Sequence, residues 1–317
     1  MKRKKLLNHL IIEINPTRLI LIKSKPGAAI IESIQKGATP LLASYLNLVD
    51  STTLFPEAFF DRKIVEITRI LNTFESITLG EMDSLRLLKR TDTKYIFHQS
   101  MLPEVLQGLA QDYAVLSVDG IRLQPYATRY FDTPDFKLYR QHHNGQRDRY
   151  KLRVRSYVQT GLDVLEVKRK DNQDRTRKSL LPGVSLPLEN SPEISSFLAG
   201  SFPMNEEMLV PKLTNGFYRI ALASRSQRER LSLDLAIHFN TPGNQFSLPG
   251  VLVAEVKQPR FSSRSVFVQK MRQMGCRPIC FSKYCVGAAL AYSHLNRNAF
   301  KPLLLSLQNL ILQGVTP

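Results

Sequence analysis

The feature that most constrains the fold of this chain is a nine-residue segment with a cation at every second position. It reads Arg147-Asp148-Arg149-Tyr150-Lys151-Leu152-Arg153-Val154-Arg155. Because side chains alternate between the two faces of a β-strand, a strand here would carry all five cations on one face. Five like charges in a row repel one another unless water or an anion lies against them. The segment therefore predicts a strand whose cationic face meets solvent or a negatively charged ligand.

The tripeptide Glu-Val-Lys occurs twice, as Glu166-Val167-Lys168 and as Glu255-Val256-Lys257. In a strand, the glutamate and the lysine of each copy share one face. A carboxylate placed beside cations suits a divalent metal ion on phosphate oxygens, because Mg²⁺ takes one or two carboxylates together with phosphate and water. Each copy alone would usually mean a salt-bridged strand face. Together with the cationic segment, the two copies indicate a highly charged phosphate ligand.

Other strand-like segments show the same division into a charged face and an apolar face. Between Arg228 and Phe239, one face carries Arg230, Ser232 and Asp234, and the opposite face carries leucines. An antiparallel sheet with one solvated face would explain this pattern. A sheet closed into a barrel, with the polar face inward and helices over the apolar face, would explain why the polar faces are dominated by Arg and Lys. We therefore expect an α+β fold built on an antiparallel β-barrel with flanking helices.

The overall charge supports a polyanionic partner. The 317 residues carry a formal net charge of +17, which favours nucleic acid, a phosphate-rich substrate or anionic lipid. No basic patch interleaved with aromatic residues favours nucleic acid. The apolar stretch 6–22 is interrupted by polar residues, so we expect neither a secretory signal nor an integral membrane segment. Three cysteines do not suggest a disulfide framework, so a reducing, cytoplasmic location is expected.

The pattern of apolar residues divides the chain into an N-terminal extension of unknown role (1–62), a main domain (63–300) and a helical tail (301–317). Helices are predicted at 63–74, 81–88, 102–109, 267–274, 286–295 and 303–312. Strands are predicted at 91–97, 126–132, 147–158, 162–170, 217–223, 229–239 and 251–258, with a strand edge at 279–283. Residues 192–209 are expected to be helical or irregular.

The acidic residues in the strand-like segments are the candidate metal ligands: Glu166, Asp234, Glu255 and Asp92. Phosphoryl transfer requires positioning and charge neutralisation more than covalent help from the protein. We find no glycine-rich phosphate loop of the P-loop type and no set of nucleophile and base. The residues alone therefore point to a phosphate ligand without identifying a reaction.

An ordered series of short motifs resembles the vacuolar transporter chaperone (VTC) domain, a member of the CYTH-like triphosphate tunnel metalloenzymes. The resemblance runs from about Glu81 to Leu295. The motifs are Arg90-Thr91-Asp92-Thr93-Lys94-Tyr95, Tyr130-Phe131-Asp132-Thr133, Lys151-Leu152-Arg153-Val154-Arg155, Leu165-Glu166-Val167-Lys168, Phe217-Tyr218-Arg219, Arg230-Leu231-Ser232-Leu233-Asp234, Ala254-Glu255-Val256-Lys257 and Phe281-Ser282-Lys283-Tyr284. Each motif is weak, but their order is specific.

The resemblance implies an antiparallel β-barrel tunnel lined by cations. Members of the VTC type make inorganic polyphosphate from the terminal phosphate of ATP with a divalent metal, here Mg²⁺ or Mn²⁺. Other tunnel enzymes hydrolyse triphosphate, act on thiamine triphosphate or cyclise ATP. The implied catalytic residues are Lys94, Arg153, Arg155, Lys168 and Lys283, the implied phosphate-binding residues are Lys151, Lys178, Arg219, Arg230 and Lys257, and Glu255 is the leading metal ligand.

The chain departs from the family pattern at two positions. Related tunnel enzymes begin with Glu-x-Glu-x-Lys, where this chain has Arg90 and Asp92 in place of the two acids. This counts against a second metal ion and against efficient hydrolysis. Some polymerase members also have a lysine where this chain has Cys280, so one phosphate contact would be missing.

Three functions are compatible with these features. The first is a metal-dependent polyphosphate polymerase that uses ATP. The second is an inorganic triphosphatase, or another triphosphate hydrolase, on the same fold. The third is a non-catalytic module that binds polyphosphate or another polyanion, whose binding would depend steeply on salt. The sequence does not predict the oligomeric state.

Overall fold

The computed structural model describes residues 62–313, except 86, 88–89, 174, 187, 189–190 and 204–208. The predicted extension 1–62 therefore lies outside the described residues, apart from its last position. The elements, in chain order, are α3 (Arg62–Leu71), β1 (Glu75–Ile77), α4 (Leu79–Ser84), β2 (Thr91–His98), η2 (Gln99–Met101), α5 (Leu102–Leu109), β3 (Tyr113–Leu116), β4 (Leu123–Asp132), α6 (Lys137–His143), β5 (Arg149–Tyr157), β6 (Leu162–Lys170), β7 (Thr176–Pro182), α7 (Pro192–Ser201), β8 (Val210–Ser224), β9 (Arg230–Thr241), β10 (Asn244–Ser247), β11 (Val251–Gln258), α8 (Val266–Gln273), α9 (Lys283–Ala291), η4 (Asn298–Phe300) and α10 (Lys301–Gln313).

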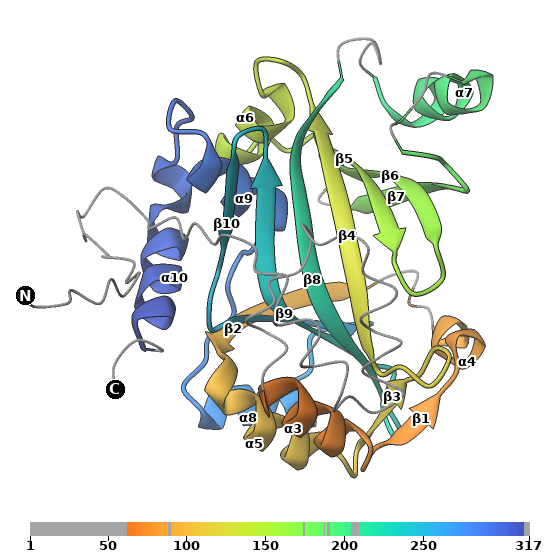
Figure 1. Ribbon diagram of the computed structural model, residues 1–317, viewed down its shortest axis with the longest axis vertical. Coiled ribbons are helices and arrows are strands. Elements are labelled where there is room, and N and C mark those ends of the chain that lie inside the picture. Colours follow the sequence, from red (N-terminus) through yellow and green to blue (C-terminus); the bar gives the residue numbers. More distant parts are fainter. Residues whose placement is uncertain are drawn as a thin grey trace, which may run out of the picture.

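The fold is α+β, with one large sheet and helices on both of its faces (Figure 1). The main ladder runs β2-β11-β9-β8-β4-β5-β6-β7, and all its neighbours are antiparallel. The predicted antiparallel sheet with flanking helices is thus confirmed. The two end strands, β2 and β7, form no ladder with each other among the described residues, so hydrogen bonds do not close the barrel.

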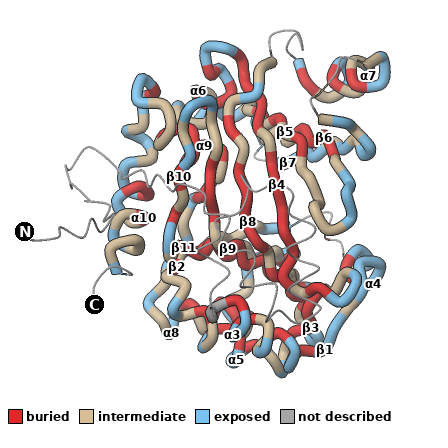
Figure 2. Tube along the Cα trace, in the orientation of Figure 1, coloured by how far each residue is buried: buried red, intermediate tan, exposed pale blue. Residues whose placement is uncertain are grey.

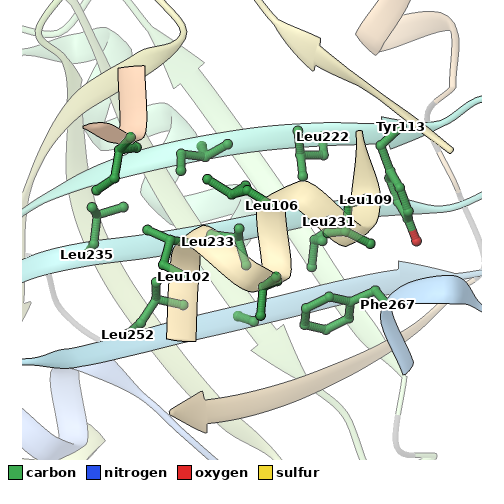
Figure 3. Packing of buried hydrophobic residues seen from close by; sticks show 14 of the residues in the cluster. Leu102, Leu106, Leu109, Tyr113, Leu222, Leu231, Leu233, Leu235, Leu252 and Phe267 are labelled. Carbon is green, nitrogen blue, oxygen red and sulfur yellow. The ribbon is translucent and has the colours of Figure 1, made fainter. Parts of the chain in front are cut away.

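One apolar face of the sheet is covered by α3, α5 and α8. Figure 3 shows Leu102, Leu106 and Leu109 of α5 lying over leucines of β8, β9 and β11. The helix is amphipathic, with Pro103 in its first turn, where a missing N–H costs nothing. Burying such a side chain contributes roughly 1.5–3 kcal/mol. This packing therefore fixes the strands whose opposite faces carry Lys94, Glu255 and Asp234.

A bulge in β9 reverses the alternation of its side chains. Ala236 has φ 51°, and the pairing with β8 shifts between Gly216 and Tyr218. Leu231, Leu233 and Leu235 consequently pack beneath α5, whereas Ile237 and Phe239 belong to a second cluster with α9 and α10. The single apolar face expected for 229–239 is wrong for this reason. A bulge of this kind leaves no simple signal in the hydrophobic pattern.

Helix α9 lies unusually close to β8 and β9. A Cβ on Gly287 would lie 2.5 Å from Leu213 and 2.7 Å from Phe239. Glycine at this position therefore permits the approach of the helix. Lys283 is the first residue of α9, so this packing also sets the position of its ammonium group.

The outer face of β5 and β6 is covered by α7. Leu152, Val154, Leu165 and Val167 pack there with Ile194 and other residues of α7. Figure 2 shows that the central strands are buried along much of their length and that the surrounding helices are more exposed. The cationic strands are therefore held from behind by an apolar layer, as the alternation predicted.

Most predicted elements are confirmed to within a few residues, and the main error lies near α9. Residues 279–283 were expected to form a strand edge, but Lys283 begins a helix capped by the side chain of Ser282. The short strands β1, β3 and β10 and the helix α6 were not predicted. No helix of the described residues is long and apolar enough to span a membrane.

Candidate phosphate-binding site

The predicted phosphate-binding residues gather on one face of the sheet, which we call the cationic face. Cross-strand registers place Lys151, Lys168 and Lys178 side by side on β5, β6 and β7. At the other end of the ladder, Lys94, Glu255 and Ser232 are aligned on β2, β11 and β9, beside the row Asp92, Lys257 and Arg230. The cationic face is defined by Lys94, Lys151, Arg153, Arg155, Lys168, Lys178, Arg219, Arg230, Lys257 and Lys283, with Asp92, Glu166, Asp234 and Glu255 among them.

The sheet curls so that its two ends face each other. β2 and β6 are far apart in the ladder. Even so, burial and then the ammonium groups of Lys94 and Lys151 lower the pKa of Lys168 to about 7. An influence of Lys94 on Lys168 requires the two ammonium groups to lie near each other, because water and salt screen distant charges. The cationic face is therefore concave, and Lys94 of β2 lies across it from Lys168 of β6.

Glu166 lies at the centre of one group of cations. Its carboxylate is 1% exposed and accepts hydrogen bonds from Arg153 at 2.6 Å and from Lys178 at 2.8 Å. Arg155 lies 3.7 Å away. Burial alone would raise the pKa of Glu166, but the three cations hold it well below its usual range. Glu166 is thus a buried counter-ion with more positive than negative charge around it.

Asp234 forms the second group, with Arg219 and Lys283. Arg219 donates two hydrogen bonds to its carboxylate, at 2.6 and 2.8 Å, and the Lys283 ammonium donates another. These partners outweigh the effect of burial and lower the pKa of Asp234 to about 2. Burial, only partly offset by Asp234, lowers the pKa of Lys283 to about 8. A cation in the first turn of a helix also opposes the helix dipole, so stability alone does not explain Lys283.

Glu255 forms the third group, together with Asp92. Glu255 lies 3.0 Å from the Lys94 ammonium and also contacts that of Lys257. Burial works against its ionised form, yet Lys257 and Lys94 hold the pKa of Glu255 well below its usual range. Asp92 lies 3.9 Å from the same Lys257 ammonium and 2.9 Å from Arg90. Two carboxylates from neighbouring strands therefore flank one cation.

Several buried polar atoms on the cationic face have no hydrogen-bond partner. They are the Thr128 hydroxyl, the Arg155 Nε and the Ser232 hydroxyl. A buried donor without a partner costs about 1–3 kcal/mol. Thr128 lies opposite Arg155 in the register of β4 and β5, and Ser232 lies opposite Glu255 in that of β9 and β11. Buried polar atoms without a partner therefore lie within the rows that carry the charged groups.

The sequence reasoning missed an aromatic lining of the cationic face. Tyr126 stacks on Phe217, and the guanidinium groups of Arg219 and Arg155 lie 5.1 and 5.7 Å from the centre of the Tyr126 ring. Tyr130 lies beneath Arg153 in the same manner. Cation–π contacts of this kind hold a guanidinium in place without consuming its hydrogen-bond donors. The period-two spacing of Tyr126, Thr128 and Tyr130 was the signal available in the sequence.

Part of the motif Tyr130-Phe131-Asp132-Thr133 has a structural role. Asp132 is fully buried and accepts hydrogen bonds from the backbone N–H groups of Leu138 and Tyr139 and from the Tyr284 hydroxyl. It therefore ties the start of α6 to α9. Burial raises the pKa of Asp132 despite these hydrogen bonds. This carboxylate anchors the helix that carries Lys283 and does not belong to the cationic face.

The acidic residues differ in how well they fit a divalent metal ion. Among the described residues, no three His, Cys, Asp or Glu side chains gather into a metal cluster. All four carboxylates are paired with cations through both oxygens, but those of Glu166 and Asp234 are only 1% and 5% exposed. Glu255 and Asp92 are 19% and 23% exposed and flank a single position. A pair of carboxylates fits Mg²⁺ or Mn²⁺ that takes its remaining ligands from phosphate and water.

The solved structures similar to this chain include three of low identity. A candidate adenylate cyclase from Bacillus halodurans is 14% identical over 61% of this chain and 94% of its own, with a TM-score of 0.41. A candidate adenylyl cyclase from Hippeastrum, described as having a dominant triphosphatase activity, is 14% identical over 64% and 96%, with a TM-score of 0.38. The Pct1 RNA triphosphatase of S. pombe is 10% identical over 81% and 93%, with a TM-score of 0.25. Similarity at this level does not identify a reaction.

Comparison with protein families gives a more specific result. No curated protein matches this chain. The family model of the VTC domain matches residues 89–185, which run from the segment before β2 to the end of β7 and include Lys94, the cationic strand and Glu166. The recognition of a VTC domain from the sequence motifs is therefore confirmed for residues 89–185.

Proposed function

We propose that this chain is a metal-dependent polyphosphate polymerase that transfers the γ-phosphate of ATP to a growing polyphosphate chain. The observation that supports this best is the excess of cations on the concave face. Ten cations surround four acids there, and several of the donors are buried. A ligand with roughly one negative charge per phosphate would neutralise such a row along its whole length. The VTC match over the strands that carry six of these ten cations supports the same ligand class.

In the proposed reaction, the terminal oxygen of the polyphosphate chain attacks the γ-phosphorus of ATP. A new P–O bond forms, the bond between the γ-phosphorus and the β–γ bridging oxygen breaks, and ADP leaves. Lys94, Arg153, Arg155, Lys168 and Lys283 are the candidate catalytic residues, because they can neutralise the charge that moves between the attacking and leaving oxygens. Lys151, Lys178, Arg219, Arg230 and Lys257 would hold the rest of the chain.

A divalent ion, Mg²⁺ or Mn²⁺, would neutralise part of the phosphate charge. Glu255 and Asp92 are the residues of this chain that would hold it. Glu166 and Asp234 would instead keep their arginines and lysines in place, and they would compete with the ligand for those cations. This division narrows the set of metal ligands expected from the sequence, and it follows from how deeply each carboxylate is buried.

Hydrolysis of triphosphate on the same face is the second candidate. In the absence of ligand, burial and the ammonium groups of Lys94 and Lys151 lower the pKa of Lys168 to about 7, so a Lys168 that stayed neutral with triphosphate bound could accept a proton. An attacking water would need such an acceptor, whereas the phosphate end of a polyphosphate chain would not. Arg90 stands where related enzymes have an acid, and this difference counts against hydrolysis.

To test this proposal, the purified protein is incubated with γ-labelled ATP and Mn²⁺ or Mg²⁺, and the products are separated by length on a gel. The polymerase predicts a ladder of long polyphosphate. Free phosphate without a ladder would favour hydrolysis, and binding without turnover would favour a non-catalytic module. Lys283→Ala and Arg153→Ala should each reduce turnover strongly. Arg225→Ala, which removes an exposed ion pair with Glu75, is the matched control and should have no effect.

A further inference from the structure

We propose that an apolar cavity beside the cationic face is a binding site for the nucleobase of the nucleoside triphosphate. This inference rests on the proposed function and adds the location of the base. The cavity has a volume of about 310 Å³, which is in the range of small-molecule pockets. Its apolar lining comes from β4 to β7 and from α4, and includes Leu79, Tyr126, Tyr157, Leu162, Leu180 and Pro182.

The cavity continues directly from the cationic face along three strands. On β6, Leu162 and Val164 lie on the same side of the sheet as Glu166, and on β7, Leu180 and Pro182 lie on the same side as Lys178. On β5, Tyr157 follows Arg155 on that side. On all three strands, the side chains on this side of the sheet change from charged to apolar at neighbouring positions of the register. A ligand lying across this boundary would need an anionic part joined to an apolar part.

Tyr126 is the residue shared by the two regions. Its ring lines the cavity and also lies beneath the guanidinium groups of Arg155 and Arg219. Tyr157 packs against it edge to face, with ring centroids 5.3 Å apart. Aromatic side chains in this arrangement are suited to contact a flat heterocycle. A base bound here would have its phosphates start at Arg155.

The wall of the cavity carries several apolar side chains that are exposed to solvent. Leu79, Leu162 and Leu180 are 52%, 41% and 41% exposed, and all three line the cavity. Single exposed leucines need no explanation, but exposed apolar residues gathered around a concavity mark a binding site. Its hollow shape fits a ring-sized ligand better than a flat protein partner. The polar residues Asp83, Gln159 and Thr160 also line it and offer partners for amino or hydroxyl groups of a nucleoside.

The test compares ATP with tripolyphosphate, which has the same anionic part and no base. Both dissociation constants are measured by calorimetry for the wild-type protein and for Leu162→Asn. This substitution replaces an exposed apolar side chain with an uncharged polar one and leaves the cationic face intact. The expected result is a loss of roughly tenfold in ATP affinity, the lower part of the range for one base stack. Tripolyphosphate affinity should change by less than about twofold, and so should both affinities in the control Leu305→Asn.

A second measurement avoids reliance on one variant. The chain contains no tryptophan, so Tyr157→Trp places a unique fluorophore in the cavity wall. ATP should quench its emission, and tripolyphosphate should not. Unchanged ATP affinity in Leu162→Asn together with equal responses of the fluorophore to both ligands would overturn the nucleobase site. If tripolyphosphate itself fails to bind the wild-type protein, the proposed function fails instead, so the two failures can be told apart.

Discussion

The replacement Glu166→Gln tests whether the acids of the cationic face are counter-ions. The carboxylate is 1% exposed and is surrounded by Arg153, Arg155 and Lys178. Removing one partner of a buried ion pair typically costs about 3–5 kcal/mol, because the other partner stays buried without compensation. The cations here are 23%, 11% and 34% exposed, so water screens part of the repulsion. We expect a loss of about 3 kcal/mol in the free energy of unfolding.

Urea denaturation measures this loss, and a thermal melt should show a decrease of roughly 6–12 °C for a chain of this size. The matched control is Glu104→Gln, which removes an exposed ion pair with Lys270 and should cost less than about 1 kcal/mol. Tripolyphosphate without metal should bind Glu166→Gln more tightly than wild type, because the carboxylate no longer competes for the three cations. Equal stability losses in both variants, or weaker tripolyphosphate binding, would refute this account of Glu166.

Three further predictions concern other parts of the site. Because burial and the charges of Lys94 and Lys151 lower the pKa of Lys168 to about 7, anion binding should raise that pKa and take up protons at pH 7. Calorimetry in buffers of different ionisation heat should show this uptake, and Lys168→Arg should remove most of it. Glu255→Gln should weaken Mn²⁺-dependent turnover while leaving metal-free tripolyphosphate binding intact, and a loss of both would contradict its role as a metal ligand. Gly287→Ala should cost about 1–3 kcal/mol from overpacking and lower turnover by displacing α9, whereas Gly108→Ala, where a Cβ meets only ordinary contacts, should not destabilise the protein.

The sequence predicted the cationic face well because strand alternation is a local property. Once β5 and β6 were identified, period-two spacing placed Arg153 and Arg155 on one face of β5 and Glu166 and Lys168 on one face of β6. The apolar residues between them showed which faces of the two strands coincide. The register that sets Lys178 beside Lys168 follows from the short hairpin between β6 and β7. For this part of the fold, the pattern of charges carried nearly all the information.

The pairing of the acids could not be predicted in the same way. Asp234 meets Arg219 across a strand pair and Lys283 from a helix that begins 49 residues later. That second contact depends on the close approach of α9 at Gly287, and on a bulge at Ala236 that the hydrophobic pattern does not reveal. The strand edge expected at 279–283 was wrong because the start of α9 is equally hard to recognise from the sequence. A short segment with few periodic residues gave no indication that Ser282 caps a helix.

The central claim is that the concave cationic face binds a chain of phosphates. A crystal structure of the protein with tripolyphosphate tests it most directly. The account predicts phosphate groups in contact with Arg153, Arg155 and Lys168. Tripolyphosphate found only on the outer, helix-covered side of the sheet, or absent from the concave face at saturating concentration, would contradict it.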